Sequence, residues 1–342
     1  MLVSVVIPVY NSGSNILKAL QSLMGQTYKN IEIIVILDGC TDDTLDWCKK
    51  CQVKDERIKI IEQENAGTYM ARYNGIEKAK GQYIMFLDSD DYLDRDAIRL
   101  LVDLANKNNS DVIRFRYEKI EDGQVKYIQD EYFPNEKEVT LDKSEFREKL
   151  YPFFLEGYMV SSIWANFIKR GVIPKNNLER RVNFGEDLLF NLNCFNNINS
   201  ITFISEPLYK YCTTEGSTTR TYNVKKLLQN LDDALYVYIK LYYYALQWNI
   251  DKESMNKLRI RIVYELSTII DKLNKTGQDV NKDIARILNN EQYKELKDNI
   301  EKSKIEPTMK NYDLVMDMID KEVYTANSLW YFNYKNMGLS IY

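Results

Sequence analysis

The sequence predicts an α/β protein with a mostly parallel sheet covered by helices on both faces, followed by a helical region toward the C-terminal end. Through about residue 115, short β-branched runs alternate with segments of helical spacing, which is typical of parallel sheets. Residues 225–246 and 253–273 contain no glycine or proline and predict long helices. With 342 residues, 45% of them apolar, the chain is long enough for one large or two modest domains.

The N-terminal part begins with two pairs of strand and helix. Residues 3–9 form an apolar, β-branched run that predicts a buried strand. Residues 16–24 place leucine and isoleucine at helical spacing, and Gly25 is suited to end that helix. Residues 31–37 predict the second buried strand, and Thr41 can cap a helix that runs through Lys50.

The alternation continues through two further repeats. Residues 58–61 predict a short strand, and residues 68–80 predict a helix. Residues 83–87 predict the next strand, Asp94 can cap a helix through Asn106, and residues 112–117 predict another strand.

Three loops of this pattern follow the first, second and fourth strands, at residues 10–14, 38–41 and 88–91. The carboxyl ends of parallel strands share one edge of a sheet, and ligands bind outside that edge. We therefore expect these loops to lie together on one rim and to hold the binding site.

Beyond residue 115 the pattern changes twice. From about residue 118 to 179 the periodicity weakens, and short aromatic stretches stand between charged turns. After about residue 221 the spacing is helical again. We divide the chain into residues 1–115, residues 116–220 and a helical appendage over residues 221–342.

Composition excludes several function classes. The chain contains no histidine, so Ser-His-Asp catalysis, histidine-based zinc sites and histidine-held haem are impossible. A net charge of −4 is too balanced for a protein that grips nucleic acid through its phosphates. No run approaches the roughly 20 apolar residues of a membrane helix.

Five cysteines do not make a disulfide framework in a chain of this length, and the odd number favours reduced thiols in the cytoplasm. Cys48 and Cys51 form a C-x-x-C pair. They could belong to a metal or redox site, or they could be two small apolar positions on a helix.

The acidic run 88–91, Asp-Ser-Asp-Asp, follows the predicted strand 83–87. In extended backbone alternate side chains share a face, so Asp88 and Asp90 can converge on one point. Carboxylate oxygens of this kind suit Mg²⁺ or Mn²⁺ together with substrate phosphates. The alternative is an acidic turn before the helix capped by Asp94.

The predicted strands 3–9 and 31–37 are also followed by residues that can bind a ligand. Asp38 can hydrogen-bond a ligand, and Gly39 lets the backbone turn closely, although the residues after it also suit a helix start. Pro8, Tyr10 and Asn11 end the first strand, where the tyrosine ring could pack on a flat base.

These segments, taken in order, closely resemble the family 2 glycosyltransferases of the GT-A fold, whose domain is Rossmann-like. The resemblance is strong over residues 3–115, patchy over 116–220 and absent after that. The matching segments are residues 6–11, 26–28, 38–44, 65–67, 71–75, 81–91, 185–190, 208–211 and 216–217. The family implies a nucleotide-sugar-binding part in residues 1–115 and an acceptor-binding and catalytic part in residues 116–220.

The resemblance assigns the donor site residue by residue. Pro8, Tyr10 and Asp38 match the positions that contact the uracil of a UDP-sugar. Arg72 matches a position near the base, and Asp88 matches the first carboxylate of the acidic motif, near the ribose.

The same comparison assigns the catalytic roles. Asp90 matches the ligand of a Mn²⁺ or Mg²⁺ ion, and Asp91 assists through the metal's shell. Asp187 matches the general base, with Glu186 as its neighbour and a possible contact to the acceptor. Trp164 lies where the family places a tryptophan that lines the acceptor side.

One departure concerns the diphosphate of the donor. After the closing Tyr-x-Tyr segment the family often has an arginine or histidine, whereas this chain has Cys212 and Thr213. Arg220 or Lys210 could take that place.

We therefore expect an inverting glycosyltransferase that moves a sugar from a UDP-sugar to a hydroxyl of a glycan, a lipid-linked glycan or a glycoprotein. The alternatives are a sugar-1-phosphate nucleotidyltransferase and a binding module without turnover. Glu186 and Asp187 could also be no more than acidic residues at a helix start, where the helix dipole favours them.

The aromatic tail suggests further partners. Residues 235–248 place tyrosine, tryptophan and leucine around more than one face of a helix, which fits packing on the catalytic domain or contact in a homo-oligomer. Trp330, Tyr331, Phe332 and Tyr334 suit an interface with a bilayer, which would place the protein at the inner face of the plasma membrane.

Overall fold

A computed structural model describes residues 1–128, 137–149, 162–174, 182–213 and 223–288. The chain forms two compact units. Among the described residues, the first unit comprises 1–128, 137–149, 162–174 and 190–213, and the second comprises 182–189 and 223–288. The predicted boundary at residue 221 lies outside the described residues, and the second unit takes in Val182–Leu189 from the predicted middle part.

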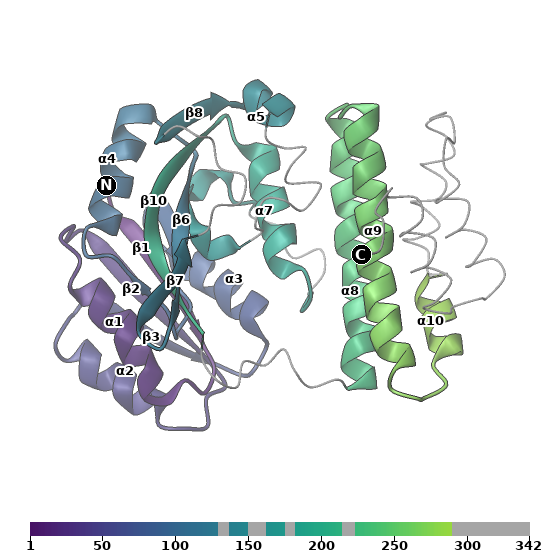
Figure 1. Ribbon diagram of the computed structural model, residues 1–342. Coiled ribbons are helices and arrows are strands. Elements are labelled where there is room, and N and C mark those ends of the chain that lie inside the picture. The colour runs from purple at the N-terminus through teal and green to yellow at the C-terminus, as the bar shows by residue number, and fades with distance from the viewer. Residues whose placement is uncertain (129–136, 150–161, 175–181, 214–222, 289–342) are drawn as a thin grey trace. The chain divides into compact units, whose positions relative to one another are not determined.

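The first unit contains the predicted α/β pattern. Its first four strands run parallel in the order β3-β2-β1-β4. Every residue of β1 and β2 is buried, because helices cover both faces of the sheet (Figure 1). The elements are β1 (Val3–Val9), α1 (Ile16–Met24), β2 (Ile31–Asp38), α2 (Thr44–Gln52), β3 (Ile58–Gln63), α3 (Thr68–Lys78), β4 (Tyr83–Phe86) and α4 (Ala97–Asn108).

The sheet continues beyond β4 with strands of mixed direction. β9 lies between β4 and β6 and is antiparallel to both. β10 is parallel to β6, and β5, β7 and β8 are antiparallel to their partners. These strands are β5 (Tyr92–Leu93), β6 (Val112–Glu121), β7 (Gln124–Ile128), β8 (Glu138–Asp142), β9 (Asn166–Lys169) and β10 (Ser200–Cys212).

Two helix starts differ from the prediction. α2 begins at Thr44, with Asp43 and not Thr41 as its N-cap, because the Thr41 N–H donates to Asn11 Oδ1 at 2.8 Å and holds that residue in the loop. α4 begins at Ala97 and not after Asp94. Asp94 is used elsewhere: its N–H donates to the carbonyl of Leu208, next to the short pairing of β5 with β10. Tertiary hydrogen bonds thus shift both helix starts by two residues.

The middle of the chain adds two α-helices to the described structure. They are α5 (Lys143–Lys149) and α7 (Glu186–Asn197). α7 begins after Gly185, whose φ of +74° is a left-handed conformation that favours glycine. The first residues of α7 belong to the second unit, and the residues from Phe190 belong to the first.

Besides Val182–Leu189, the described part of the second unit consists of residues 223–288, which were predicted to be helical. Its helices are α8 (Val224–Gln247), α9 (Lys252–Asn274) and α10 (Asn281–Leu288). The side chains of Asn223 and Asp251 accept backbone N–H groups at the starts of α8 and α9, as N-cap residues do. α9 and α10 both pack on α8. Among the helices that the structure describes, none has the length and apolar character needed to cross a bilayer.

The aromatic residues of α8 divide between inside and outside. Tyr236, Tyr238 and Tyr242 are buried, whereas Tyr243 is 46% exposed. The aromatic residues predicted to meet a bilayer, 330–334, lie outside the described residues.

All five cysteines carry free thiols. Cys48 and Cys51 are buried on α2, and burial raises the pKa of the Cys48 thiol to about 12. Thiols of this kind stay protonated and unreactive, so the pair fits the prediction of two small apolar positions.

Candidate functional site

The three predicted loops do meet at one rim of the sheet. The Asn11 side chain after β1 bonds Thr41 after β2, and the Ser12 hydroxyl lies 3.1 Å from that of Ser89 after β4. The Gly13 N–H donates to Thr44 Oγ1 at 2.8 Å. The predicted rim is therefore confirmed, and side-chain hydrogen bonds hold its loops together.

The first strand contributes two predicted donor residues to the rim. Pro8 is buried within β1. Tyr10 follows the strand and is 55% exposed, so its ring is free to pack on a ligand. Asn11 adopts a φ of +46°, which turns the chain sharply after Tyr10.

Asp38, at the end of β2, is 3% exposed. Its Oδ1 accepts from Gln63 Nε2 and from the Ala66 N–H, both at 2.7 Å, and its Oδ2 accepts from the Gly67 N–H at 2.8 Å. The carboxylate therefore fixes the loop that leads into α3. If Asp38 also contacts uracil, it would do so through the lone pairs of its carboxylate that these three hydrogen bonds leave available.

Gly39 is required by the same turn. Its φ is +70°, and a Cβ at this position would lie 2.7 Å from the backbone nitrogen of Asn65. The loops after β2 and β3 can approach each other this closely only because residue 39 has no side chain.

Arg72 and Asp88, which the family resemblance assigns to the base and to the ribose of the nucleotide, form an ion pair. Arg72 Nη2 lies 2.9 Å from Asp88 Oδ1, and the arginine side chain is only 7% exposed against 28% for the aspartate. The pair joins α3 to the acidic run and leaves part of the Asp88 carboxylate open to the rim.

The acidic run is a turn and not an extended strand. β4 ends at Phe86, and the Asp91 N–H donates to the Asp88 carbonyl at 3.2 Å. The prediction that Asp88 and Asp90 converge by strand alternation is therefore wrong. Asp88 and Asp90 are both partly exposed at the rim, whereas Asp91 points inward and is 1% exposed.

Asp91 is held by the last strand of the sheet. Its Oδ2 accepts from the Tyr209 hydroxyl at 2.6 Å, and its Oδ1 accepts from the Cys212 N–H at 2.7 Å. The Tyr209 oxygen in turn accepts the Asp88 N–H at 3.2 Å. Burial, and then the negative charge of Asp88, raise the pKa of the Asp91 carboxyl to about 8.

Tyr209 is the residue that sequence reasoning missed. It was recognised only as part of a closing strand, yet it is fully buried and bonds both ends of the acidic turn. The available signal was its position two residues before Tyr211 in a family segment, but tyrosine is too frequent here, with 26 residues, for that spacing to stand out.

Trp164 lies in an aromatic stack with the closing strand. Its ring centroid is 4.3 Å from that of Tyr209 and 5.9 Å from that of Tyr211, with nearly parallel planes. Tyr117 meets it edge-on at 4.9 Å. Trp164 is 7% exposed, and the outer member of the stack, Tyr211, is 36% exposed.

The ammonium group of Lys210 is engaged in contacts within the protein. Its Nζ lies 2.8 Å from both Asp94 Oδ2 and Glu118 Oε2, and it donates to the carbonyl of Pro207. Because its charge is paired with two carboxylates, Lys210 is poorly suited to neutralise the diphosphate of the donor. The other suggested cation, Arg220, lies outside the described residues.

Glu186 and Asp187 occupy the first turn of α7. This position is compatible both with a catalytic role and with acidic residues that only stabilise a helix start. The Gly185 carbonyl before them accepts the Leu189 N–H at 3.0 Å and closes that turn.

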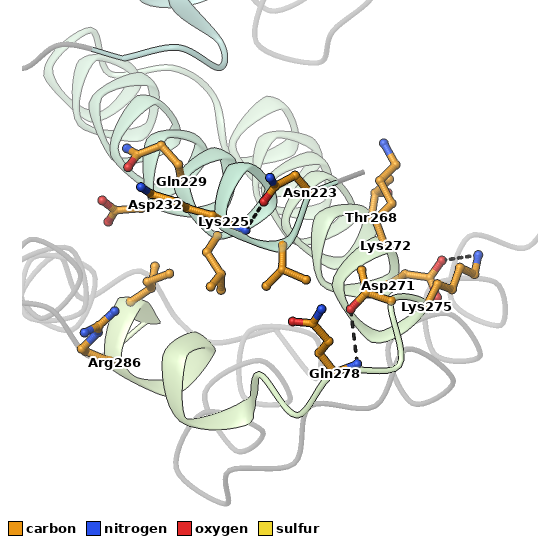
Figure 2. Close-up of a pocket in the computed structure, with 14 residues that line it drawn as sticks. Asn223, Lys225, Gln229, Asp232, Thr268, Asp271, Lys272, Lys275, Gln278 and Arg286 are labelled. Atoms are coloured by element: carbon orange, nitrogen blue, oxygen red, sulfur yellow. Dashed lines mark hydrogen bonds and ion pairs between the residues drawn. The ribbon is translucent and has the colours of Figure 1, made fainter. Parts of the chain in front are cut away.

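In the part of the chain that the structure describes, no group of three or more Cys, Asp or Glu side chains is arranged to enclose a metal ion. A groove of about 1300 Å³ does lie on the second unit, lined by residues of α8, α9 and α10 and of the segments beside them (Figure 2). It contains none of the predicted site residues.

The α/β sheet, with an acidic turn and an exposed tyrosine at its strand ends on one rim, fits the GT-A fold. The chain belongs to glycosyl transferase family 2, whose profile matches residues 4–201.

Relatives and structures agree with this assignment. The chain is 30% identical over 238 residues to glycosyltransferase GlyA of Streptococcus pneumoniae, which covers 68% of this chain and 33% of GlyA. It is 31% identical over 220 residues to the uncharacterized glycosyltransferase EpsJ of Bacillus subtilis, 64% of this chain and 63% of EpsJ. The match thus spans less than two thirds of each relative.

Among solved structures, S. aureus TarS 1–349 in complex with UDP shares the fold. The TM-score is 0.61 at 18% identity, over 84% of this chain and 81% of TarS 1–349. The same protein in complex with UDP-GlcNAc gives 0.56 at 18% identity, over 89% and 92%.

Proposed function

We propose that the protein transfers a sugar from a UDP-sugar to an acceptor hydroxyl. The observation that carries this proposal is the acidic turn 88–91, fixed at the rim beside the loops after β1 and β2. Tyr10 would pack on the uracil, Pro8 and Asp38 would border it, and the Arg72–Asp88 pair would lie near the base and ribose. TarS, which shares the fold, has been solved with UDP and with UDP-GlcNAc.

The donor set of the turn fits a divalent cation. Mg²⁺ and Mn²⁺ are commonly held by one or two carboxylates together with substrate phosphates, so a dedicated cage is not required. We assign Asp90 as the ligand, with Asp88 beside it. Asp91, whose oxygens both accept protein hydrogen bonds, would support the turn from inside. When bound, the cation would neutralise the charge of the departing diphosphate.

The acceptor hydroxyl must lose its proton as it attacks the anomeric carbon. In a chain without histidine, a positioned carboxylate is the natural base, and we assign this role to Asp187. Glu186 would contact the acceptor, and Trp164 would line the acceptor side through its stack with Tyr211. With Asp187 as the single base and no second nucleophile assigned, the reaction we propose is a direct displacement with inversion at the anomeric carbon.

The acceptor is a glycan, a lipid-linked glycan or a glycoprotein, and the site is proposed to work in the cytoplasm or at the inner face of the plasma membrane. We also propose that copies of the protein contact each other through α8 to α10. Exposed Tyr243 is one residue of α8 that such contact would cover.

The proposal is tested by measuring UDP release and product formation with a panel of UDP-sugars and hydroxyl acceptors, with Mn²⁺, Mg²⁺ or EDTA. Asp90→Asn keeps the shape but loses the charge, so we expect metal-dependent transfer to be abolished while the protein stays folded. Asp46→Asn, on the exposed side of α2, is the matched control and should be fully active.

The same assay separates the alternatives. Full activity of Asp90→Asn, or of the wild type in EDTA, would remove the metal from the mechanism. Release of pyrophosphate from a nucleoside triphosphate and a sugar phosphate would indicate a nucleotidyltransferase. Binding of UDP-sugar without any product would indicate a binding module.

A further inference from the structure

The helical unit contains a charged residue in an unexpected place. Asp233, in the middle of α8, is 0% exposed and is flanked by buried apolar residues, among them Leu231 and Ala234. A buried carboxylate is costly unless it is hydrogen-bonded, so its partners indicate what it does.

One partner lies directly before α7. Asp233 Oδ2 accepts the backbone N–H of Asn183 at 2.7 Å, a bond between residues 50 positions apart in the sequence. Asp233 Oδ1 accepts from Gln229 Nε2 at 2.9 Å, one turn earlier on α8, which fixes the direction of the carboxylate. Both oxygens of the carboxylate are thus engaged, and one of them holds the segment 182–185.

A second contact lies one turn further along α8. A Cβ on Gly185 would lie 3.4 Å from Val237 Cγ1, so the backbone of residue 185 rests against the side chain four positions after Asp233. Val237 and Val182 are both buried. One face of α8 therefore fixes the segment 182–185 at two points, through a charge-assisted hydrogen bond and a close packing contact.

This segment sets where α7 starts. Gly185 takes a φ of +74°, and its carbonyl accepts the Leu189 N–H at 3.0 Å to close the first helical turn. Glu186 and Asp187 lie in that turn, one to four residues from the anchored Asn183 and Gly185. All of these residues belong to the second unit.

We propose that Asp233 is a positioning residue for the start of α7 and so for the general base Asp187. The inference rests on the proposed function for its catalytic meaning. It gives the helical appendage a role in the reaction itself: α8 orients the carboxylate that takes the acceptor's proton. A catalytic group that is misplaced by about 1 Å can cost up to about 10²-fold in rate.

The test compares Asp233→Leu with Asp233→Asn. Leucine removes the acceptor and with it the bond that ties the Asn183 N–H to α8, whereas asparagine can still accept that bond, and the Gln229 amide can rotate to suit it. Asp232→Leu is the matched control, because Asp232 is the neighbouring residue and lines the groove of Figure 2.

We expect Asp233→Leu to lower kcat by about 10- to 100-fold with the KM for UDP-sugar within about twofold. Asp233→Asn should restore kcat to within about threefold, and Asp232→Leu should leave it unchanged. If Asp233→Leu loses stability but keeps kcat, or if both leucine variants lose kcat equally, the residue is merely structural and the proposal is wrong.

Hydrogen exchange of the amides in residues 183–188 gives a readout that needs no turnover. Their protection should fall in Asp233→Leu and persist in Asp233→Asn. Unchanged protection in Asp233→Leu would overturn the anchoring. If amide protection falls in Asp233→Leu as expected, but the wild type transfers no sugar to any acceptor, the anchoring of residues 182–185 is supported and the proposed function is wrong. If Asp233→Leu does not fold, Gly185→Ala, which perturbs the same contact from the other side, should show the same loss of kcat.

Discussion

Removal of a single buried hydroxyl, in Tyr209→Phe, should loosen the acidic turn at the centre of the site. The hydroxyl donates to Asp91 Oδ2 at 2.6 Å and accepts the Asp88 N–H at 3.2 Å. Phenylalanine keeps the ring and hence the stack on Trp164, so the substitution removes only these two hydrogen bonds.

The magnitude follows from the two bonds. A hydrogen bond to a charged group contributes about 1.5–3 kcal/mol, and a buried backbone N–H left without a partner costs about 1–3 kcal/mol. The Asp88 turn can relax in part, so at pH 9, where the Asp91 carboxyl is charged, we expect a loss of about 2–4 kcal/mol in the free energy of unfolding of the first unit. With a urea slope of about 2–3 kcal/mol per M, the midpoint should fall by roughly 1 M.

The effect should also depend on pH. Burial raises the pKa of Asp91 from its ordinary value to about 8, so the wild type binds a proton there that the unfolded chain has released. The stability that this group contributes is therefore highest at acid pH and falls as the pH rises toward about 8. The Tyr209 bond favours the charged form, so Tyr209→Phe should destabilise the protein more at pH 9 than at pH 6.

The assay is urea unfolding in EDTA at both pH values, with Tyr211→Phe as the matched control. Tyr211 belongs to the same stack but is 36% exposed, and its ring makes the contacts. A loss below about 1 kcal/mol in Tyr209→Phe, an equal loss in Tyr211→Phe, or a larger effect at pH 6 would refute this account of the turn.

Three further outcomes follow from the same structure. Asp187→Asn should leave UDP-sugar affinity near normal and lower the transfer rate by roughly 10²–10⁴, and an unchanged rate would move the base elsewhere, first to Glu186. Gly39→Ala should lower the melting temperature, with a loss above about 1–2 kcal/mol, because φ is +70° and the new Cβ would meet Asn65; a stable variant would show that the loop can shift. Burial favours the neutral form of Glu32, but hydrogen bonds from Lys59 and other donors outweigh it and lower its pKa. The stability that the Glu32 carboxylate contributes should therefore be lost as the pH falls below about 4.5. The melting temperature of Glu32→Gln should accordingly fall less than that of the wild type when the pH is lowered into this range.

The sequence by itself determined most of the strands and helices of the first 115 residues and the position of the three loops that form the rim, but not strand β5 or the starts of α2 and α4. Apolar periodicity is a local property, and a buried parallel strand such as Val3–Val9 shows it in every residue. The same holds for the two long helices of the second unit. The acidic run and the Gly185–Asp187 segment were recognisable because their residue types and order resemble a known family.

Only the tertiary structure decided how these residues are used. The insertion of antiparallel β9 between β4 and β6 and the turn at Asp88–Asp91 depend on pairings that no spacing encodes. The bond from Tyr209 to Asp91 joins residues 118 positions apart, and the bond from Asn183 to Asp233 joins residues 50 apart. A buried carboxylate takes whichever donor the folded chain brings to it, and that choice is made by packing and desolvation over the whole domain, not by the sequence around it.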